Sequence, residues 1–367
     1  MPDPRATELL HSLFELVVRR GASDLHLRPG AMAKVRVSGR LEDATSAPLE
    51  PALVTALVEA SMSESVHEDY LARREADYAV VVEGLARFRA NAFRTRGADA
   101  CVMRLVRETP VPLSDLDMPV SVPELARKPR GLVLVTGPTG SGKSTTLAAM
   151  VDLINRERAV HVLTLEDPIE VLHTDRVATI TQRELGSDTL DWSGALRSAM
   201  RQDPDVILIG ELRDKETVHA ALTAAETGHL VLGSMHTNDA RETVNRLIEF
   251  FPAEEHQRVR AVLSGSLEGV VCQRLVPRMD GDGRVCVVEV AVRDARFAEA
   301  VAEPEKTHSI PDIIASGEYS GMQTFDQHLQ RLVMSGVLDE NSAKANATNP
   351  HDLTVMLRRA GWNPITV

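Results

Sequence analysis

The chain has 367 residues, of which 43% are hydrophobic and 26% are charged, and its formal net charge is −12 at pH 7. This composition excludes a globally disordered or fibrous chain, because there is enough apolar material for more than one packed core. No stretch approaches the ~18 consecutive apolar residues of a membrane-spanning helix, and the start, Met1-Pro2-Asp3-Pro4, predicts no secretory signal. The acidic excess disfavours a protein that grips bulk nucleic acid, without excluding local basic patches.

The three cysteines carry information about the cellular setting. Cys101, Cys272 and Cys286 are scattered, and none of them forms a C-x-x-C pair. They are typical of a reducing cytoplasm, and they exclude both a disulfide framework and a four-cysteine zinc site.

The first hundred residues predict a small α+β domain. Apolar residues between Leu9 and Val17 recur at helical spacing, and Gly21 follows as a helix stop. Period-two alternation predicts half-buried strands over residues 24–28 and 34–37. A second helical stretch over residues 51–74 precedes three further expected strands, at residues 78–83, 86–93 and 100–106.

A proline-rich passage marks the expected domain boundary. Five prolines fall between Pro110 and Pro129, where they interrupt a helix or a central strand. We therefore predict an N-terminal domain over residues 1–109, a linker over 110–129, and a second domain over 130–367.

The second domain has a different pattern, with continuous apolar strands separated by helical stretches. The expected strands are Gly131–Val135, Val162–Leu165, Val206–Ile209 and Leu230–Leu232. Such strands alternating with helices indicate a mainly parallel sheet that is covered on both faces. The pattern becomes helical from about Ser309 onward.

A phosphate-binding loop is the most specific motif in the chain. Residues 137–144 match the pattern G-x-x-x-x-G-K-S, directly after an expected strand and at the start of an expected helix. Its glycines allow successive backbone N–H groups to point at phosphate oxygens, Lys143 reaches the β- and γ-phosphates, and the Ser144 hydroxyl ligates Mg²⁺. The expected nucleotide-binding residues are Gly137, Pro138, Thr139, Gly140, Ser141, Gly142, Lys143, Ser144 and Thr145.

Two strand-end carboxylates predict hydrolysis as well as binding. Glu211 follows the buried strand that begins after Asp205, in the usual Walker B layout, where it can contact Mg²⁺ or the water around it. Glu166 ends another strand and can point at the γ-phosphate. Either acid could instead cap a helix or pair with an arginine.

Two histidines flank an expected strand. His229 and His236 are seven residues apart with no third His or Cys beside them, so metal ligation is rejected. A hydrogen-bonded core histidine is one interpretation of each, and a sensor of the phosphate state is the alternative for His236.

Arginines are the candidate cations for charge that develops during transfer of the γ-phosphate. A group of them lies on the strands of the first domain, and Arg197 and Arg201 are four residues apart, which places both on one helical face. Most charge runs are solvated faces. An arginine from a neighbouring subunit would predict a ring with sites between subunits.

Several motifs in order resemble the type IV pilus retraction ATPases, the PilT/PilU family of secretion-type ATPases, over essentially the whole chain. The segments that carry the resemblance are 22–27, 137–145, 164–170, 210–214, 225–229 and 321–326. The resemblance implies a PAS-like N-terminal domain, a RecA-like P-loop ATPase domain, and a homohexamer in the cytoplasm at the inner face of the cytoplasmic membrane. There ATP hydrolysis with Mg²⁺ would act on an inner-membrane platform protein and remove pilin, producing twitching motility.

The resemblance also implies roles for individual residues. Lys143 and Ser144 belong to Walker A, Glu166 to the Asp box as general base, and Glu211 to Walker B. His229 and His236 form the His box. Arg89 and Arg104 match the N-terminal-domain arginines that approach the nucleotide.

Two departures bear on the branch of the family. Retraction ATPases carry an Ala-Ile-Arg-Asn-Leu-Ile stretch, whose Arg and Asn are replaced here by Ala298 and Glu299. This change bears on autonomous retraction, and the longer tail, which includes residues 349–356, resembles PilU, an accessory retraction paralogue. The four-cysteine zinc insert of the assembly and secretion relatives is absent, which favours the retraction branch.

The leading hypothesis is therefore a Mg²⁺-ATP-driven hexameric motor of pilus retraction. The alternatives are a pilus-assembly or secretion motor of the same fold, and a regulatory nucleotide-binding subunit that depends on a sister ATPase. A nucleic-acid motor is disfavoured, because it would need a basic channel, which the net charge of −12 does not indicate.

Overall fold

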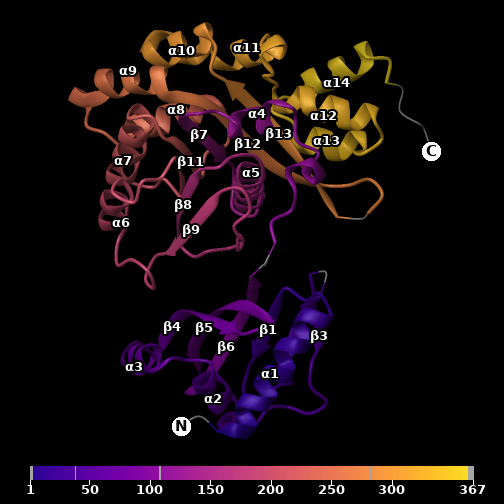
Figure 1. The fold of residues 1–367 in the computed structure, drawn as a ribbon. Helices are drawn as coiled ribbons and strands as arrows, with labels where there is room; N and C mark the ends of the chain where they lie inside the picture. Colours follow the sequence, from indigo (N-terminus) through magenta and orange to yellow (C-terminus); the bar gives the residue numbers. More distant parts are fainter. Residues whose placement is uncertain (1–2, 38, 107–108, 282, 363–367) are drawn as a thin grey trace. The chain divides into compact units, whose positions relative to one another are not determined.

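The computed structural model describes residues 3–37, 39–106, 109–281 and 283–362. Met1 and Pro2, which are part of the start that predicts no secretory signal, lie outside the described residues. The chain divides into two compact units, Met1–Thr109 and Pro110–Val367, and each is described by itself (Figure 1).

The N-terminal unit is an antiparallel sheet with helices packed on one face, as its α+β pattern predicts. The six strands lie in the order β3-β2-β1-β6-β5-β4, and all their pairings are antiparallel. Phe14 from α1 stacks on Phe88 from β5 with ring centroids 4.2 Å apart, inside a continuous apolar core. The elements are α1 (Pro4–Arg19), β1 (Asp24–Leu27), β2 (Lys34–Val37), β3 (Arg40–Asp43), α2 (Pro51–Ala60), α3 (Glu64–Arg73), β4 (Glu75–Val82), β5 (Ala86–Thr95) and β6 (Ala98–Val106).

The expected helix over residues 51–74 is in fact two helices. The chain leaves α2 at Ser61, and α3 starts after Ser63, whose hydroxyl caps it by accepting the N–H of Val66 at 3.4 Å. The break follows from side-chain chemistry, since serine favours a helix N-cap over a helix interior.

The C-terminal unit is built on a seven-stranded sheet in the order β13-β12-β7-β11-β10-β8-β9. All neighbours are parallel except the β12–β13 hairpin, so the predicted mainly parallel sheet is confirmed. The strands are β7 (Gly131–Thr136), β8 (His161–Glu166), β9 (Thr179–Glu184), β10 (Val206–Ile209), β11 (Leu230–Met235), β12 (Leu267–Pro277) and β13 (Arg284–Val292).

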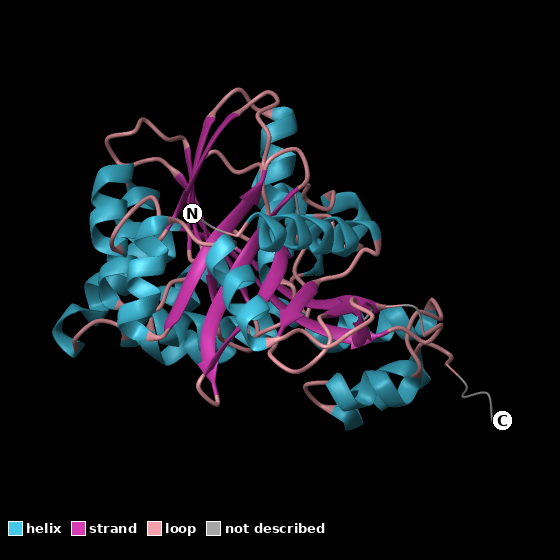
Figure 2. Cartoon of the chain, turned by 90° about the horizontal axis from the view of Figure 1, so that it is seen from below, coloured by secondary structure: helices cyan, strands magenta, loops and turns pink. Residues whose placement is uncertain are grey.

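Helices cover both faces of this sheet, as Figure 2 shows. Alternate residues of β7 enter different cores: Leu132 and Leu134 join one cluster, whereas Val133 and Val135 join the other. This is why the strand is continuously apolar. The helices are α4 (Ser121–Ala126), α5 (Lys143–Glu157), α6 (Trp192–Ala199), α7 (Lys215–Glu226), α8 (Ala240–Glu249), α9 (His256–Ser266), α10 (Ala295–Ala302), α11 (Ile310–Ala315), α12 (Phe325–Met334), α13 (Glu340–Asn346) and α14 (Pro350–Arg359), with short 3-10 turns η1 (Leu113–Leu116), η2 (Ala253–Glu255), η3 (Pro304–Ser309) and η4 (Glu318–Ser320).

The prediction of a linker over residues 110–129 is wrong for most of its length. Leu113 from η1 and Leu125 from α4 are buried in the same core as α5. Pro123 is accommodated because it is the third residue of α4, within the first turn, where a backbone N–H has no partner in the helix.

The predicted start of the helical C-terminal region is also too late. Helices follow β13 directly, beginning with α10 at Ala295 rather than near Ser309. Asp294 caps α10 by accepting the N–H of Phe297 at 2.8 Å, a local signal that the sequence contains.

Candidate active site

The phosphate loop joins β7 to α5 in the conformation that its motif requires. Gly137 has φ of 140°, and a Cβ there would lie 2.4 Å from the backbone oxygen of Gln273 on β12. Gly142, with φ of 93°, forms the N-cap of α5. The loop therefore presents the N-terminus of α5, where free N–H groups and the positive end of the helix dipole favour an anion.

Lys143 is folded back onto this loop. Its Nζ donates to the carbonyl oxygens of Gly137 at 2.8 Å and Pro138 at 3.2 Å. Burial lowers the pKa of Lys143, and the nearby carboxylates of Glu211 and Glu170 oppose that shift. The ammonium thus lies at the centre of the loop, in reach of any group that the loop binds.

The parallel strands bring three further side chains to the same edge of the sheet. Next to β7, the sheet continues with β11, then β10, then β8. The carboxyl ends of these strands lead into His236, Glu211 and Glu166 respectively. The His236 ring lies between Lys143 and Glu211, with Nδ1 3.5 Å from the Nζ of Lys143 and Nε2 3.6 Å from the Oε1 of Glu211. Lys143, His236 and Glu211 therefore form one cluster.

Glu166 lies at the end of β8 with its own hydrogen-bond partners. The hydroxyl of Thr164 donates to its Oε1 at 2.7 Å, and the amide of Gln182 on β9 donates at 3.2 Å. Burial raises the pKa of Glu166 above its ordinary value, while these two hydrogen bonds lower it in part. A carboxylate with a raised pKa is a better proton acceptor, which suits a general base.

His229 does not join this cluster within the chain. It precedes β11, whereas His236 follows it, so the six residues of the strand separate the two by about 20 Å. The Nδ1 of His229 lies 3.0 Å from the carbonyl of Ala224 at the end of α7. His229 and His236 therefore lie at opposite ends of β11, as their flanking of the expected strand predicts.

Arg89 and Arg104 are direct partners on β5 and β6 of the N-terminal unit. Their side chains are on the face opposite the apolar core and are 46% and 70% exposed. The Nε of Arg104 donates to Asp24 at 2.8 Å, and Arg89 lies 3.8 Å from Asp77. The two predicted arginines are therefore adjacent and accessible, on the sheet of the other unit.

Arg197 and Arg201 do not share a helical face. α6 ends at Ala199, and Arg201 lies in the turn that follows. The Nη1 of Arg197 donates to the hydroxyl of Ser193 on its own helix.

Sequence reasoning missed the supports of the site. Thr164 could have been found, since it lies two residues before Glu166 and so on the same face of the strand. Gln182 and Gln273 carry no local signal, because the topology of the sheet alone brings them there. Gln273 donates to the hydroxyl of Thr146 in the first turn of α5 at 2.8 Å.

The donors beside the phosphate loop fit a magnesium ion that is shared with a nucleotide. The Ser144 hydroxyl lies in the first turn of α5 and the Glu211 carboxylate just after β10, at the same edge of the sheet, and magnesium prefers such oxygen ligands. The buried hydroxyl of Ser141 in the same loop has no hydrogen-bond partner among the described residues. Within those residues, no three His, Cys, Asp or Glu side chains gather as a metal site, and magnesium does not need such a cage when substrate phosphates complete its shell.

A cavity of about 860 Å³ lies directly beside this cluster. Its lining includes Glu211 and His236 at one side, Arg241 and Arg246 from α8, and His308 from η3. The cluster is therefore accessible rather than sealed. None of the helices in the described parts of the chain has the length and apolarity to cross a membrane.

A parallel sheet with a phosphate loop at one strand end, and carboxylates at the ends of neighbouring strands, defines a P-loop nucleoside-triphosphatase of the RecA-like kind. The chain belongs to the Type II/IV secretion system protein family, whose pattern matches residues 3–359.

Known relatives and solved structures narrow this further. The chain is 43% identical over 341 residues to the type IV pilus retractation ATPase PilT of Pseudomonas aeruginosa, covering 93% of this chain and 98% of that protein. It is 39% identical over 347 residues to the type IV pilus ATPase PilU of the same organism, covering 94% and 90%. A crystal structure of the pilus retraction motor PilT with bound ADP superimposes with a TM-score of 0.88 at 38% identity, covering 95% of this chain and 99% of that one. The predicted α/β fold and the resemblance to the retraction ATPases are thereby confirmed.

Proposed function

We propose that this chain hydrolyses ATP in a homohexameric ring and that the work retracts a type IV pilus. One observation carries the proposal: the fold places His236 3.5 Å from Lys143 and 3.6 Å from Glu211, at the sheet edge that also holds Glu166. The identity of 43% to a retraction ATPase over almost the whole chain supports pilus retraction as the process that this hydrolysis drives.

Each residue has a role in the reaction that follows from its position. The loop N–H groups and Lys143 bind the β- and γ-phosphates, and His236 hydrogen-bonds the γ-phosphate beside them. Glu166 accepts a proton from the attacking water, whose oxygen bonds to the γ-phosphorus while the bond to the bridging oxygen breaks and ADP leaves. Ser144 and Glu211 would hold Mg²⁺, which when bound neutralises phosphate charge.

A neighbouring subunit in the ring would supply further cations to the γ-phosphate. Arg89 and Arg104 are adjacent and exposed, as arginines must be to reach a nucleotide bound by a neighbouring subunit. We assign the ring to the cytoplasm, at the inner face of the cytoplasmic membrane, with an inner-membrane platform protein as its partner and no nucleic acid.

The test is to delete the gene in its host and to image surface pili in living cells. Retraction predicts pili that extend and persist, with normal behaviour restored by the wild-type gene. The Lys143→Ala variant should not restore it, because it lacks the cation that binds the phosphates. Bald cells after deletion would contradict retraction and favour the alternative of an assembly motor.

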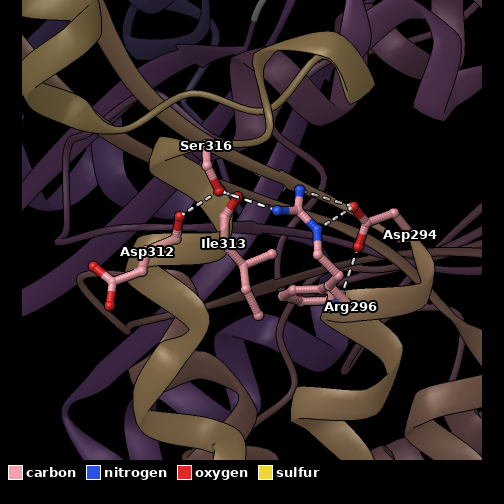
Figure 3. Close-up of polar contacts among 6 residues, drawn as sticks. Asp294, Arg296, Asp312, Ile313 and Ser316 are labelled. Atoms are coloured by element: carbon pink, nitrogen blue, oxygen red, sulfur yellow. Dashed lines mark hydrogen bonds and ion pairs between the residues drawn. The ribbon is translucent and has the colours of Figure 1, made fainter.

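A second candidate function, an accessory retraction ATPase, is favoured by the sequence of α10. The Arg and Asn of the family's retraction stretch are replaced by Ala298 and Glu299, and Glu299 pairs instead with Lys306. Figure 3 shows that α10 is also tied to α11: Arg296 lies between Asp294, at 3.3 Å, and the hydroxyl of Ser316, at 3.1 Å. Ala298 and Glu299 thus lie on a helix that is held in place, and their charges differ from those of the Arg and Asn that they replace.

This candidate has its own experiment, in a host strain that lacks the sister retraction ATPase. An accessory subunit predicts little retraction with the wild-type chain alone, and a gain with the double variant Ala298→Arg plus Glu299→Asn. Full retraction by the wild-type chain alone would contradict the accessory role.

A further inference from the structure

A buried carboxylate outside the nucleotide site is attached to the segment that carries His236. Glu289 lies on β13 opposite Cys272 of β12, and it is only 7% exposed. Its Oε1 accepts the backbone N–H of Ala240 at 2.9 Å. Ala240 is the first residue of α8, so this N–H has no partner within the helix. Glu289 supplies that partner, at the helix end where a negative charge is favoured.

The start of α8 is rigidly connected to the turn that precedes it. The hydroxyls of Thr237 and Thr243 lie 2.7 Å apart. The N–H of Asn238 donates to Glu242 at 2.9 Å, and the N–H of Glu242 donates back to Asp239 at 2.7 Å. Residues 237–239, which directly follow His236, are therefore held to the N-terminus of α8 rather than forming a free loop.

This turn sets the position of His236. The histidine follows directly after β11 and lies between Lys143 and Glu211, at 3.5 and 3.6 Å. A shift of the turn by even about 1 Å would break this arrangement, and displacements of that size can cost about 100-fold in rate. What holds the turn to the sheet therefore influences the chemistry.

We propose that Glu289 is a positioning residue for ATP hydrolysis, which holds the start of α8 through Ala240 and so fixes His236 between Lys143 and Glu211. This inference rests on the proposed ATPase function. Glu289 acts through α8 and does not itself touch the nucleotide.

The ionisation of Glu289 makes the proposal testable by the pH dependence of hydrolysis, which a merely structural group would not change. The pKa of Glu289 is raised to about 7: burial is the main cause and Asp239 at the start of α8 adds to it, while the Ala240 N–H, Arg274 and the thiol of Cys272 oppose it. The ionised carboxylate accepts the Ala240 N–H more strongly than the protonated acid does. Hydrolysis should therefore rise through pH 7 as the carboxylate forms.

The experiment compares steady-state ATP hydrolysis by the full chain with that of Glu289→Gln and Glu289→Ala between pH 6 and 8.5. Glu289→Gln keeps an acceptor for Ala240 but cannot ionise, so the component of the profile near pH 7 should vanish. Glu289→Ala removes the acceptor and should lower kcat by about tenfold or more with KM for ATP nearly unchanged.

Glu268→Gln is the matched control, because Glu268 is equally buried in the same hairpin but pairs with Lys128 and Arg293 instead of α8. It should lower thermal stability without changing the pH profile. Unchanged kcat and profile in Glu289→Gln would overturn the proposal, and so would losses in both Glu289 variants that only follow the melting temperature, as in the control. A wild-type chain that hydrolyses no ATP would instead overturn the proposed function, and this inference with it.

Discussion

At the scale of single residues, Glu166 is the general base that we propose for the hydrolysis. Burial raises its pKa, and hydrogen bonds from Thr164 and Gln182 lower it, so its proton affinity is a balance of opposing effects. A general base works only when it is deprotonated. Activity is therefore lost as the pH falls through a pKa that lies above that of an ordinary glutamate.

Changing one of these hydrogen bonds should move that pH dependence. Thr164→Val removes the donor at 2.7 Å without changing the shape of the buried side chain. Because a hydrogen bond to the charged carboxylate stabilises it, loss of this donor should raise the pKa of Glu166 further. The acid limb of kcat/KM should shift to higher pH with it.

The control for this prediction is Thr179→Val, on the neighbouring strand β9, where the residue is exposed. Its acid limb should stay where the wild-type limb is. Identical limbs for Thr164→Val and the wild-type chain would show that Glu166 does not control the pH dependence.

At the scale of elements, the proline-rich segment is part of the ATPase unit. α4 and η1 bury apolar side chains against α5, the helix that begins with Lys143. Leu125, which is 1% exposed, lies so close to Gly269 on β12 that a Cβ there would come within 2.7 Å of it. The segment therefore supports the helix that carries the phosphate loop.

Truncating this contact should destabilise the C-terminal unit. Leu125→Ala leaves a cavity and should lower the free energy of unfolding by about 2–5 kcal/mol, as seen by denaturant titration. Val120→Ala, at a side chain 78% exposed in the same segment, should cost less than about 0.5 kcal/mol. Equal effects of the two substitutions would show that the segment behaves as a linker.

Some of the elements could be predicted from the sequence alone, and others could not. The apolar strands and the phosphate loop were predictable, because burial on both faces and the glycine pattern leave a strong local signal. The site could be placed at the carboxyl ends of the strands for the same reason. β9 and the β12–β13 hairpin were not predicted, since Gln182, Gln273 and Glu289 interrupt the apolar pattern with polar side chains whose partners are distant in sequence.

At the scale of the whole molecule, the account requires sites that are completed between subunits. Arg89 and Arg104 lie on the N-terminal unit and the phosphate loop on the C-terminal one. A neighbouring copy would bring cations to the γ-phosphate.

The fraction of assembled rings and the ATPase activity per chain should therefore fall together as the protein concentration is lowered. In the presence of ATP, mass measurement should show a homohexamer, and the turnover per chain should fall when the protein is diluted below its assembly range. Arg89→Ala should lower turnover while leaving the ring intact. A monomeric fraction with full turnover per chain would contradict shared sites.

The central claim is that the sheet edge with Lys143, His236, Glu211 and Glu166 hydrolyses ATP, and Glu166→Gln tests it most directly. We expect ATP to bind with nearly unchanged affinity, while single-turnover hydrolysis falls by about 100-fold or more because the proton acceptor is lost. Glu226→Gln, at an exposed carboxylate at the end of α7, should stay within about threefold of the wild-type rate. Hydrolysis at the wild-type rate by Glu166→Gln would contradict the account.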